Sequence, residues 1–191
     1  YSNYAALHEL LKKDANTQET WPHEDRLPNS PDGLNVTFVY EMPIKNNDYK
    51  MVKIFLDHDL DNGKLTLNYT RIYWMSARYG CTNALRRLIN RLTLNYLTPL
   101  NSQRNLAHVA ALNESENSLE ILKSAKLNLD QSDADDIRPI MISASNGCVQ
   151  SLRYLVTHGA ELTKCDRFGN NLFHYAAYNN NHKIIRELSS I

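Results

Sequence analysis

A period of 33 residues constrains this chain more than any other feature of its sequence. Three alanines and three leucines each recur at this interval along the C-terminal half of the chain. They are Ala111, Ala144 and Ala177, and Leu122, Leu155 and Leu188. A spacing that several positions share is typical of repeat proteins, in which each copy is one supersecondary unit.

The residues within one copy predict two short helices joined by a turn. Leu152, Leu155 and Val156 lie at i, i+3 and i+4 and so form an apolar stripe along the second helix. One helical pair is too small to cover that stripe by itself. We therefore expect the copies to stack, with stability coming mainly from the interfaces between neighbours.

The best copy carries a recognisable family pattern. It reads Asp-Arg-Phe-Gly-Asn-Asn-Leu-Phe-His-Tyr-Ala-Ala over residues 166–177, and Gly159-Ala160 closes the copy before it. This pattern resembles the ankyrin-repeat family. The resemblance implies an all-α solenoid of stacked helix-turn-helix units with short β-hairpin-like tips. The family's Thr-Pro-Leu-His core is intact in no copy, because Asn105, Arg138 and Asn171 replace the Thr and Met141 replaces one His.

Weaker copies extend the pattern upstream and predict one domain of about five to six repeats. Residues 76–89 match residues 143–156 at an offset of 67, and residues 51–58 resemble a second helix. We place the extra residue of that offset between Leu94 and Leu100. The predicted units are a partial repeat at 1–16, a Pro-rich insertion at 17–34, a degenerate repeat at 35–66, repeats at 67–100, 101–132 and 133–165, and a C-terminal repeat at 166–191.

The resemblance also assigns structural roles to several residues. We expect Gly147 and Gly159 to end helices with positive φ angles, and residues 166–169 to form a tight turn at a hairpin tip. The motif histidines are expected to form hydrogen bonds within and between repeats rather than to bind metal. The full set of structural motif residues is His108, Pro139, Gly147, Gly159, Gly169 and His174.

Composition excludes several classes of function. The chain has 21 basic and 21 acidic side chains, which argues against a broad phosphate-binding surface and hence against nucleic-acid binding. No apolar run is long enough to predict a membrane span. Three cysteines far apart in sequence favour reduced thiols and an intracellular setting, in the cytoplasm or nucleus. Because the chain begins at Tyr1, we expect it to be a piece of something longer.

Signals of chemistry are weak. No metal-binding spacing of Cys and His occurs, and the phosphate-binding glycine loops are absent. Cys81 and Cys148 share one repeat position and are expected to be buried, whereas Cys165 precedes a turn and has no identifiable base partner. We therefore predict no catalytic residue, metal, cofactor or small-molecule substrate. Two charge clusters, of arginines at 78–91 and aspartates at 130–136, are most simply solvated faces.

The last prediction concerns the residues that would contact a partner protein. The two residues after each Ala pair fall on the side that the family uses as a concave face. We call this set the strip: Arg78, Tyr79, Leu112, Asn113, Ser145, Asn146, Tyr178 and Asn179. The predicted tips add Tyr69, Ser102, Asp136, Arg167 and Phe168. Surface tyrosines are ordinary in a chain with 11 of them, but Tyr and Arg are also enriched at binding hot spots.

These observations predict a non-catalytic module that binds a partner protein on its concave face and tips. One alternative is a domain that recruits a substrate or host target for a larger enzyme or bacterial effector, which would place it in the host cytoplasm. Another is an enzyme, which would need a pocket that joins Cys165 or a histidine to a carboxylate. Nucleic-acid binding is a third, and it would require a basic stripe.

Overall fold

The described part of the chain is entirely helical. The computed structural model describes residues 36–61, 69–91, 103–114 and 116–190, and assigns helices but no strand to them. The helices are α2 (Val36–Lys45), α3 (Tyr49–Asp61), α4 (Tyr69–Arg78), α5 (Thr82–Arg91), α6 (Leu106–Ala110), α7 (Asn117–Ser124), α8 (Pro139–Asn146), α9 (Val149–Thr157), α10 (Leu172–Tyr178) and α11 (His182–Ser190).

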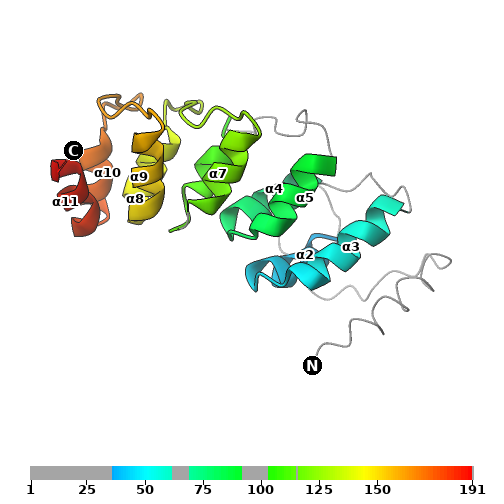
Figure 1. The fold of residues 1–191 in the computed structure, drawn as a ribbon. Coiled ribbons are helices and arrows are strands. Elements are labelled where there is room, and N and C mark those ends of the chain that lie inside the picture. Colours follow the sequence, from blue (N-terminus) through cyan, green and yellow to red (C-terminus); the bar gives the residue numbers. More distant parts are fainter. Residues whose placement is uncertain (1–35, 62–68, 92–102, 115, 191) are drawn as a thin grey trace.

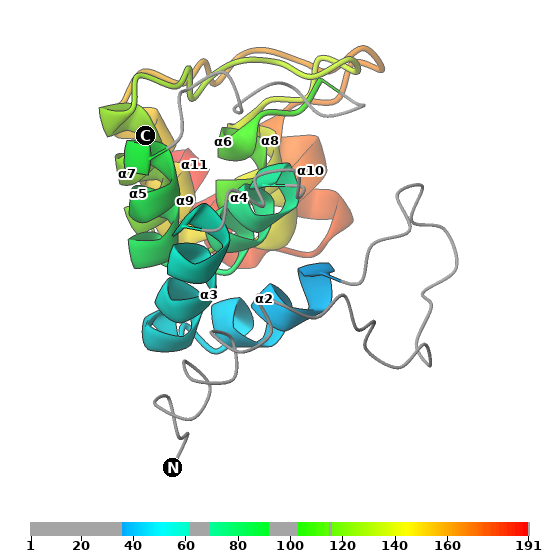
Figure 2. The same cartoon turned by 90° about the vertical axis from the view of Figure 1, so that its right-hand side faces the viewer.

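These helices form antiparallel pairs that stack side by side along the array (Figure 1). The view along the stack separates them into two layers (Figure 2). The first helices of the pairs, α2, α4, α6, α8 and α10, pack in order in one layer, and the second helices form the other. The connections from α7 to α8 and from α9 to α10 run along one edge of the stack (Figure 1). The predicted all-α solenoid is therefore confirmed.

The core runs between the two layers. Leu152 and Leu155 of α9 are 0% and 1% exposed, and Val156 is half-buried against the same core, as the apolar stripe predicted. Full burial of one such leucine contributes roughly 1.5–3 kcal/mol to folding. The core also includes alanines of the first helices, among them Ala144 at 0% exposure, whose small side chains permit close helix packing.

Two glycines end helices in the left-handed conformation, as predicted. Gly147 follows α8 with φ +76°, and Gly159 follows the C-cap of α9 with φ +88°. Residues with a Cβ rarely adopt these angles, which explains the choice of glycine. Gly147 has a second constraint, because a Cβ there would lie 2.9 Å from Oδ1 of Asn181.

The expected β-hairpin-like tips are tight turns without strands in the described residues. In the turn after α7, the Asp133 N–H donates to the Ile137 carbonyl at 2.9 Å, and Asp136 lies at φ +60°. The Asp166 N–H donates to the Asn170 carbonyl at 2.9 Å in the next turn, where Gly169 has φ +82°. The tight turn predicted at 166–169 is therefore confirmed.

Several sequence predictions fall outside the described residues. They concern the partial repeat at 1–16, the Pro-rich insertion at 17–34, the connection between Leu94 and Leu100, and Ser102. The repeat boundaries remain predictions throughout.

Candidate protein-binding surface

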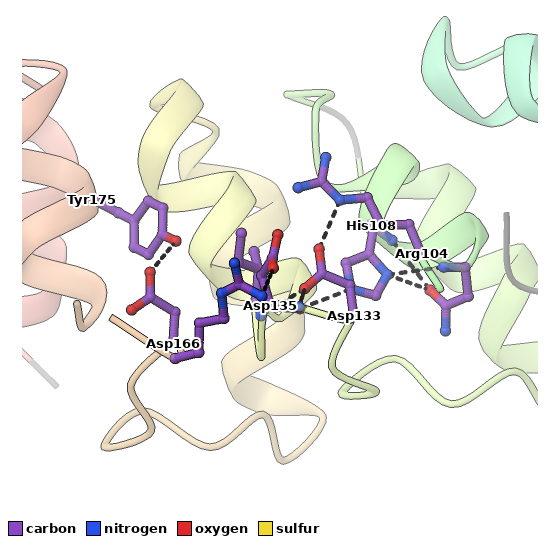
Figure 3. Close-up of polar contacts among 9 residues, drawn as sticks. Arg104, His108, Asp133, Asp135, Asp166 and Tyr175 are labelled. Carbon is purple, nitrogen blue, oxygen red and sulfur yellow. Dashed lines mark hydrogen bonds and ion pairs between the residues drawn. The ribbon is translucent and has the colours of Figure 1, made fainter. Parts of the chain in front are cut away.

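A buried carboxylate organises the turn that precedes α8 (Figure 3). Asp133 is 5% exposed, and its Oδ1 accepts the backbone N–H groups of Asp135 at 2.8 Å and Ile137 at 2.9 Å. Its Oδ2 accepts a hydrogen bond from the Nε–H of Arg104, which lies just before α6, at 2.8 Å. Burial alone would raise the pKa of Asp133, but the bonds from Arg104 and the two N–H groups outweigh it and lower that pKa.

The turn before α10 repeats this arrangement with a different outer partner. Oδ1 of Asp166 accepts the N–H groups of Phe168 at 2.9 Å and Asn170 at 2.8 Å, and Oδ2 accepts the Tyr175 hydroxyl at 2.8 Å. Burial, together with this bond to Asp166, raises the pKa of Tyr175. A neutral hydroxyl thus takes the place that the Arg104 guanidinium has at Asp133.

Adjacent turns are also tied to each other. The Arg167 N–H donates to the Asp135 carbonyl at 3.0 Å, and the two side chains form an ion pair at 2.8 Å (Figure 3). These contacts correct the prediction that the aspartates at 130–136 are simply a solvated face. Asp133 is buried, Asp135 pairs with Arg167, and Asp130 pairs with Arg138 at 2.6 Å. The carboxylates are needed inside the turns, where backbone N–H groups would otherwise lack acceptors.

His108 links two repeats. The side chain is 1% exposed, its Nδ1 accepts the Asn105 N–H at 3.1 Å, and its Nε2 lies 3.0 Å from the Ile137 carbonyl of the next turn. Burial lowers the pKa of His108 and outweighs the Ile137 carbonyl, which favours the charged form. The predicted hydrogen bonds within and between repeats are confirmed for this residue.

His174 has only the first of these two roles. Its Nδ1 accepts the Asn171 N–H at 3.2 Å, yet the side chain is exposed and its Nε2 forms no hydrogen bond with a described residue, unlike Nε2 of His108. Asn105 and Asn171, which replace the family's Thr, both act as N-caps in these boxes. The spacing Asn-x-x-His at the start of each helix was the signal that could have predicted them.

The strip residues lie at the C-terminal ends of successive first helices. Arg78 ends α4 and Tyr79 follows it, Ser145 and Asn146 end α8, and Tyr178 ends α10. Because α4, α6, α8 and α10 pack in order, the strip is continuous along one layer. Tyr178 is 91% exposed and Tyr79 37% exposed.

The middle of the strip is less available than its ends. Leu112 is half-buried against the core, and the Asn113 amide donates to the Ala77 carbonyl of the preceding repeat at 2.7 Å. Asn146 donates to the Ile142 carbonyl at 2.9 Å, and Asn179 donates to Ser145 Oγ at 2.8 Å. The Asn113 and Asn179 amides thus link neighbouring repeats, a role that the sequence analysis did not predict, whereas the Asn146 bond lies within α8.

At the tips, Arg167 and Phe168 are exposed together. The Arg167 guanidinium lies 4.7 Å from the centroid of the Phe168 ring, which is 69% exposed. Asp136 is exposed in the turn before α8. The prediction that Tyr69 lies at a tip was wrong, because Tyr69 is the first residue of α4. The equivalent helix α8 begins at Pro139. The residue of α4 that aligns with Pro139 is Ile72, and because it is not a proline, α4 begins three residues before it, at Tyr69.

The described residues offer little for catalysis. Cys81 and Cys148 are buried, as predicted, and burial raises the pKa of Cys148 to about 11. Cys165 is exposed. An open groove of about 370 Å³ between α9 and α11 has no Cys or His in its lining, which includes Arg153, Glu187 and Lys183. Within the described ranges, no group of three or more His, Cys, Asp or Glu side chains could hold a metal ion.

No helix in the described part of the chain has the length and apolar character needed to cross a lipid bilayer.

Comparison with known proteins identifies the repeats. The family model described as ankyrin repeats, in three copies, matches residues 107–190. A search of curated proteins found no match. The matched residues are those in which α6 to α11 stack with their turns and motif histidines. Ankyrin repeats are generally protein–protein interaction modules. Residues 107–190 of the chain are therefore ankyrin repeats.

Proposed function

We propose that this chain is a non-catalytic module that binds a partner protein along the strip and the tips. The observation that carries the proposal is the exposure of aromatic side chains at both ends of one continuous strip. Tyr79 is 37% exposed at the α4 end, and Tyr178 is 91% exposed at the α10 end. Tyrosine is enriched at binding hot spots, and its ring can contact a partner while its hydroxyl forms hydrogen bonds.

The turns before α8 and α10, at the opposite ends of these helices from the strip, support binding at the tips without folding. Asp133, Asp166 and the Arg167–Asp135 pair fix the turns through hydrogen bonds of 2.8–2.9 Å. A surface that is already ordered loses less conformational entropy when a partner binds. The exposed Phe168 is thus presented on a rigid support, which suits an anchor residue.

The experiment compares two exposed aromatics on the strip with one elsewhere. A partner is first identified by affinity capture with this chain and mass spectrometry, and then purified for calorimetric titration. We expect the double variant Tyr79→Ala/Tyr178→Ala to weaken binding by about 2 kcal/mol or more, which is the size of a hot-spot effect.

The matched control is Phe173→Ala, because Phe173 is 49% exposed on α10 but does not belong to the strip. This variant should bind the partner with unchanged affinity. Equal affinity of the double variant and the parent chain would contradict binding along the strip.

A further inference from the structure

We propose that the strip has a charged end and an uncharged end, and that its charged end, where Lys45 of α2 lies beside the strip residues Arg78 and Tyr79, takes a carboxylate of an acidic partner segment. This inference rests on the proposed function, since it names the chemistry of the partner that the strip would bind.

Two cations lie close to the Tyr79 ring. Lys45 Nζ lies 5.4 Å and the Arg78 guanidinium carbon 5.8 Å from the ring centroid. Lys45 comes from the end of α2 and Arg78 from the end of α4, so two adjacent repeats build this end together. A cation within about 6 Å of an aromatic ring is attracted to the face of that ring, so the two positive charges gather around Tyr79.

Lys45 and Arg78 differ in how far a neighbouring carboxylate balances their charge. Lys45 forms an ion pair with Glu41 at 2.5 Å, so its charge is largely balanced within α2. Arg78 is exposed and forms no ion pair within the described ranges. Five other described arginines are bound to carboxylates, namely Arg87, Arg104, Arg138, Arg153 and Arg167. Arg86 and Arg186 are exposed without an ion pair to a described residue, but they lie on the second helices α5 and α11, away from the strip. Arg78 therefore contributes a net positive charge with open donors, which match a carboxylate.

The charge of the strip changes from one end to the other. Every strip residue after Tyr79 is uncharged, and the position of Tyr79 is occupied by asparagine in the three later repeats. Those asparagines carry no charge, and their amides donate to Ala77, Ile142 and Ser145, so this part of the strip offers no cation to a carboxylate. At the far end, the Tyr178 ring is 91% exposed. A segment with acidic residues at one end and an apolar residue at the other matches this order.

Met42 adds an apolar contact at the charged end. It is 52% exposed and precedes Lys45 by three residues on α2, which places the two side chains on one helix face. Methionine adapts its shape to different apolar partners. We therefore expect the acidic residues of the bound segment to be interspersed with apolar side chains rather than to form a purely charged run.

The probe is a displayed library of random peptides, selected against the whole chain. Recovered peptides are synthesised with a fluorescent label and titrated at roughly 0.05 M and 0.5 M salt, where screening differs strongly. The variants are Arg78→Gln and Lys45→Gln/Arg78→Gln. The matched control is Arg86→Gln/Lys123→Gln, which removes two exposed cations from the second-helix layer. Thermal melts by circular dichroism verify that each variant is folded.

We expect the selected peptides to be enriched in Asp or Glu. Affinity should fall about fivefold to tenfold in the Arg78 variants and at high salt, and stay unchanged in the control. Peptides without acidic enrichment, bound equally by all variants, would overturn the charged end while leaving the proposed function intact. A selection that yields no peptide sensitive to Tyr79→Ala/Tyr178→Ala would contradict both proposals.

Discussion

The α8–α9 pair and the α10–α11 pair occupy the same repeat positions but have different surroundings. Ile140, Met141 and Ala144 of α8 are all 0% exposed. The residues 33 positions later are Phe173, His174 and Ala177, and all three are exposed, with Phe173 at 49%. The α8–α9 pair has described neighbours on both sides, whereas α10–α11 contacts a described pair on one side only. Burial in this array is therefore a property of the neighbours as much as of the sequence position.

The largest expected difference concerns the second-helix leucines. Leu155→Ala should lower the free energy of unfolding by about 2–5 kcal/mol, because the side chain is 1% exposed and its removal leaves a cavity between two repeats. Leu188→Ala should cost clearly less, since Leu188 is only half-buried. Urea titration followed by circular dichroism measures both. Equal losses of stability would show that the two pairs are equally well packed, and would contradict the difference in burial between them.

The next prediction separates the two motif histidines. His108→Ala should cost about 2–3 kcal/mol, because it leaves the buried Asn105 N–H without an acceptor and removes the bond to the Ile137 carbonyl, which keeps only the Asp133 N–H. His174→Ala removes only an exposed capping contact and should have a much smaller effect on the urea midpoint. If both variants lost the same stability, the bond from His108 to the next repeat would contribute nothing.

A third prediction compares two glycines of one repeat. Both have positive φ, so Gly159→Ala should cost about 1 kcal/mol through backbone strain alone. Gly147→Ala should cost about 2 kcal/mol, because its Cβ would also displace the Asn181 side chain, which donates to the carbonyls of Ala144 and Ser145. The double variant Gly147→Ala/Asn181→Ala isolates the second contribution. If Gly147→Ala cost no more than Gly159→Ala, the Asn181 contact would be irrelevant.

The smallest expected effect is a pH dependence that belongs to the internal repeats. Burial lowers the pKa of His108 below its ordinary value of 6.5, so the unfolded chain binds this proton more readily than the folded chain. The folded state should therefore lose stability as the pH falls through 6.5, and the loss should level off below the folded pKa of His108. One proton sets a ceiling of about 1.4 kcal/mol per pH unit. Urea midpoints measured across this range should show a shallower slope for His108→Gln.

His174→Gln is the comparison variant, because His174 is exposed and lacks the bond to the next repeat that His108 forms. A parent slope of zero in this range would contradict the role given to burial at His108.

The sequence predicted the architecture well because its signal is periodic. The 33-residue spacing of Leu122, Leu155 and Leu188 predicted stacked helical pairs, and Gly147 and Gly159 predicted their turns. These features depend on local conformation and on a repeated apolar stripe, both of which a single sequence displays directly.

The polar contacts between repeats could not be predicted in the same way. Arg104 meets Asp133 at a separation of 29 residues, and Asn113 meets Ala77 at a separation of 36. Nothing in the residue types indicates which of several exposed polar groups will face a neighbouring carbonyl. The placement of Tyr69 failed for a simpler reason, since the repeat alignment ignored the proline that delays the start of α8.

The bonds between the turns give the array a directional stiffness. Arg104 joins Asp133, and Arg167 joins Asp135, so three successive connections are linked along one edge of the stack. Bending that separates this edge must break charge-assisted bonds, whereas bending that compresses it need not. A load from a bound protein would therefore flex the array more easily toward its turns than away from them.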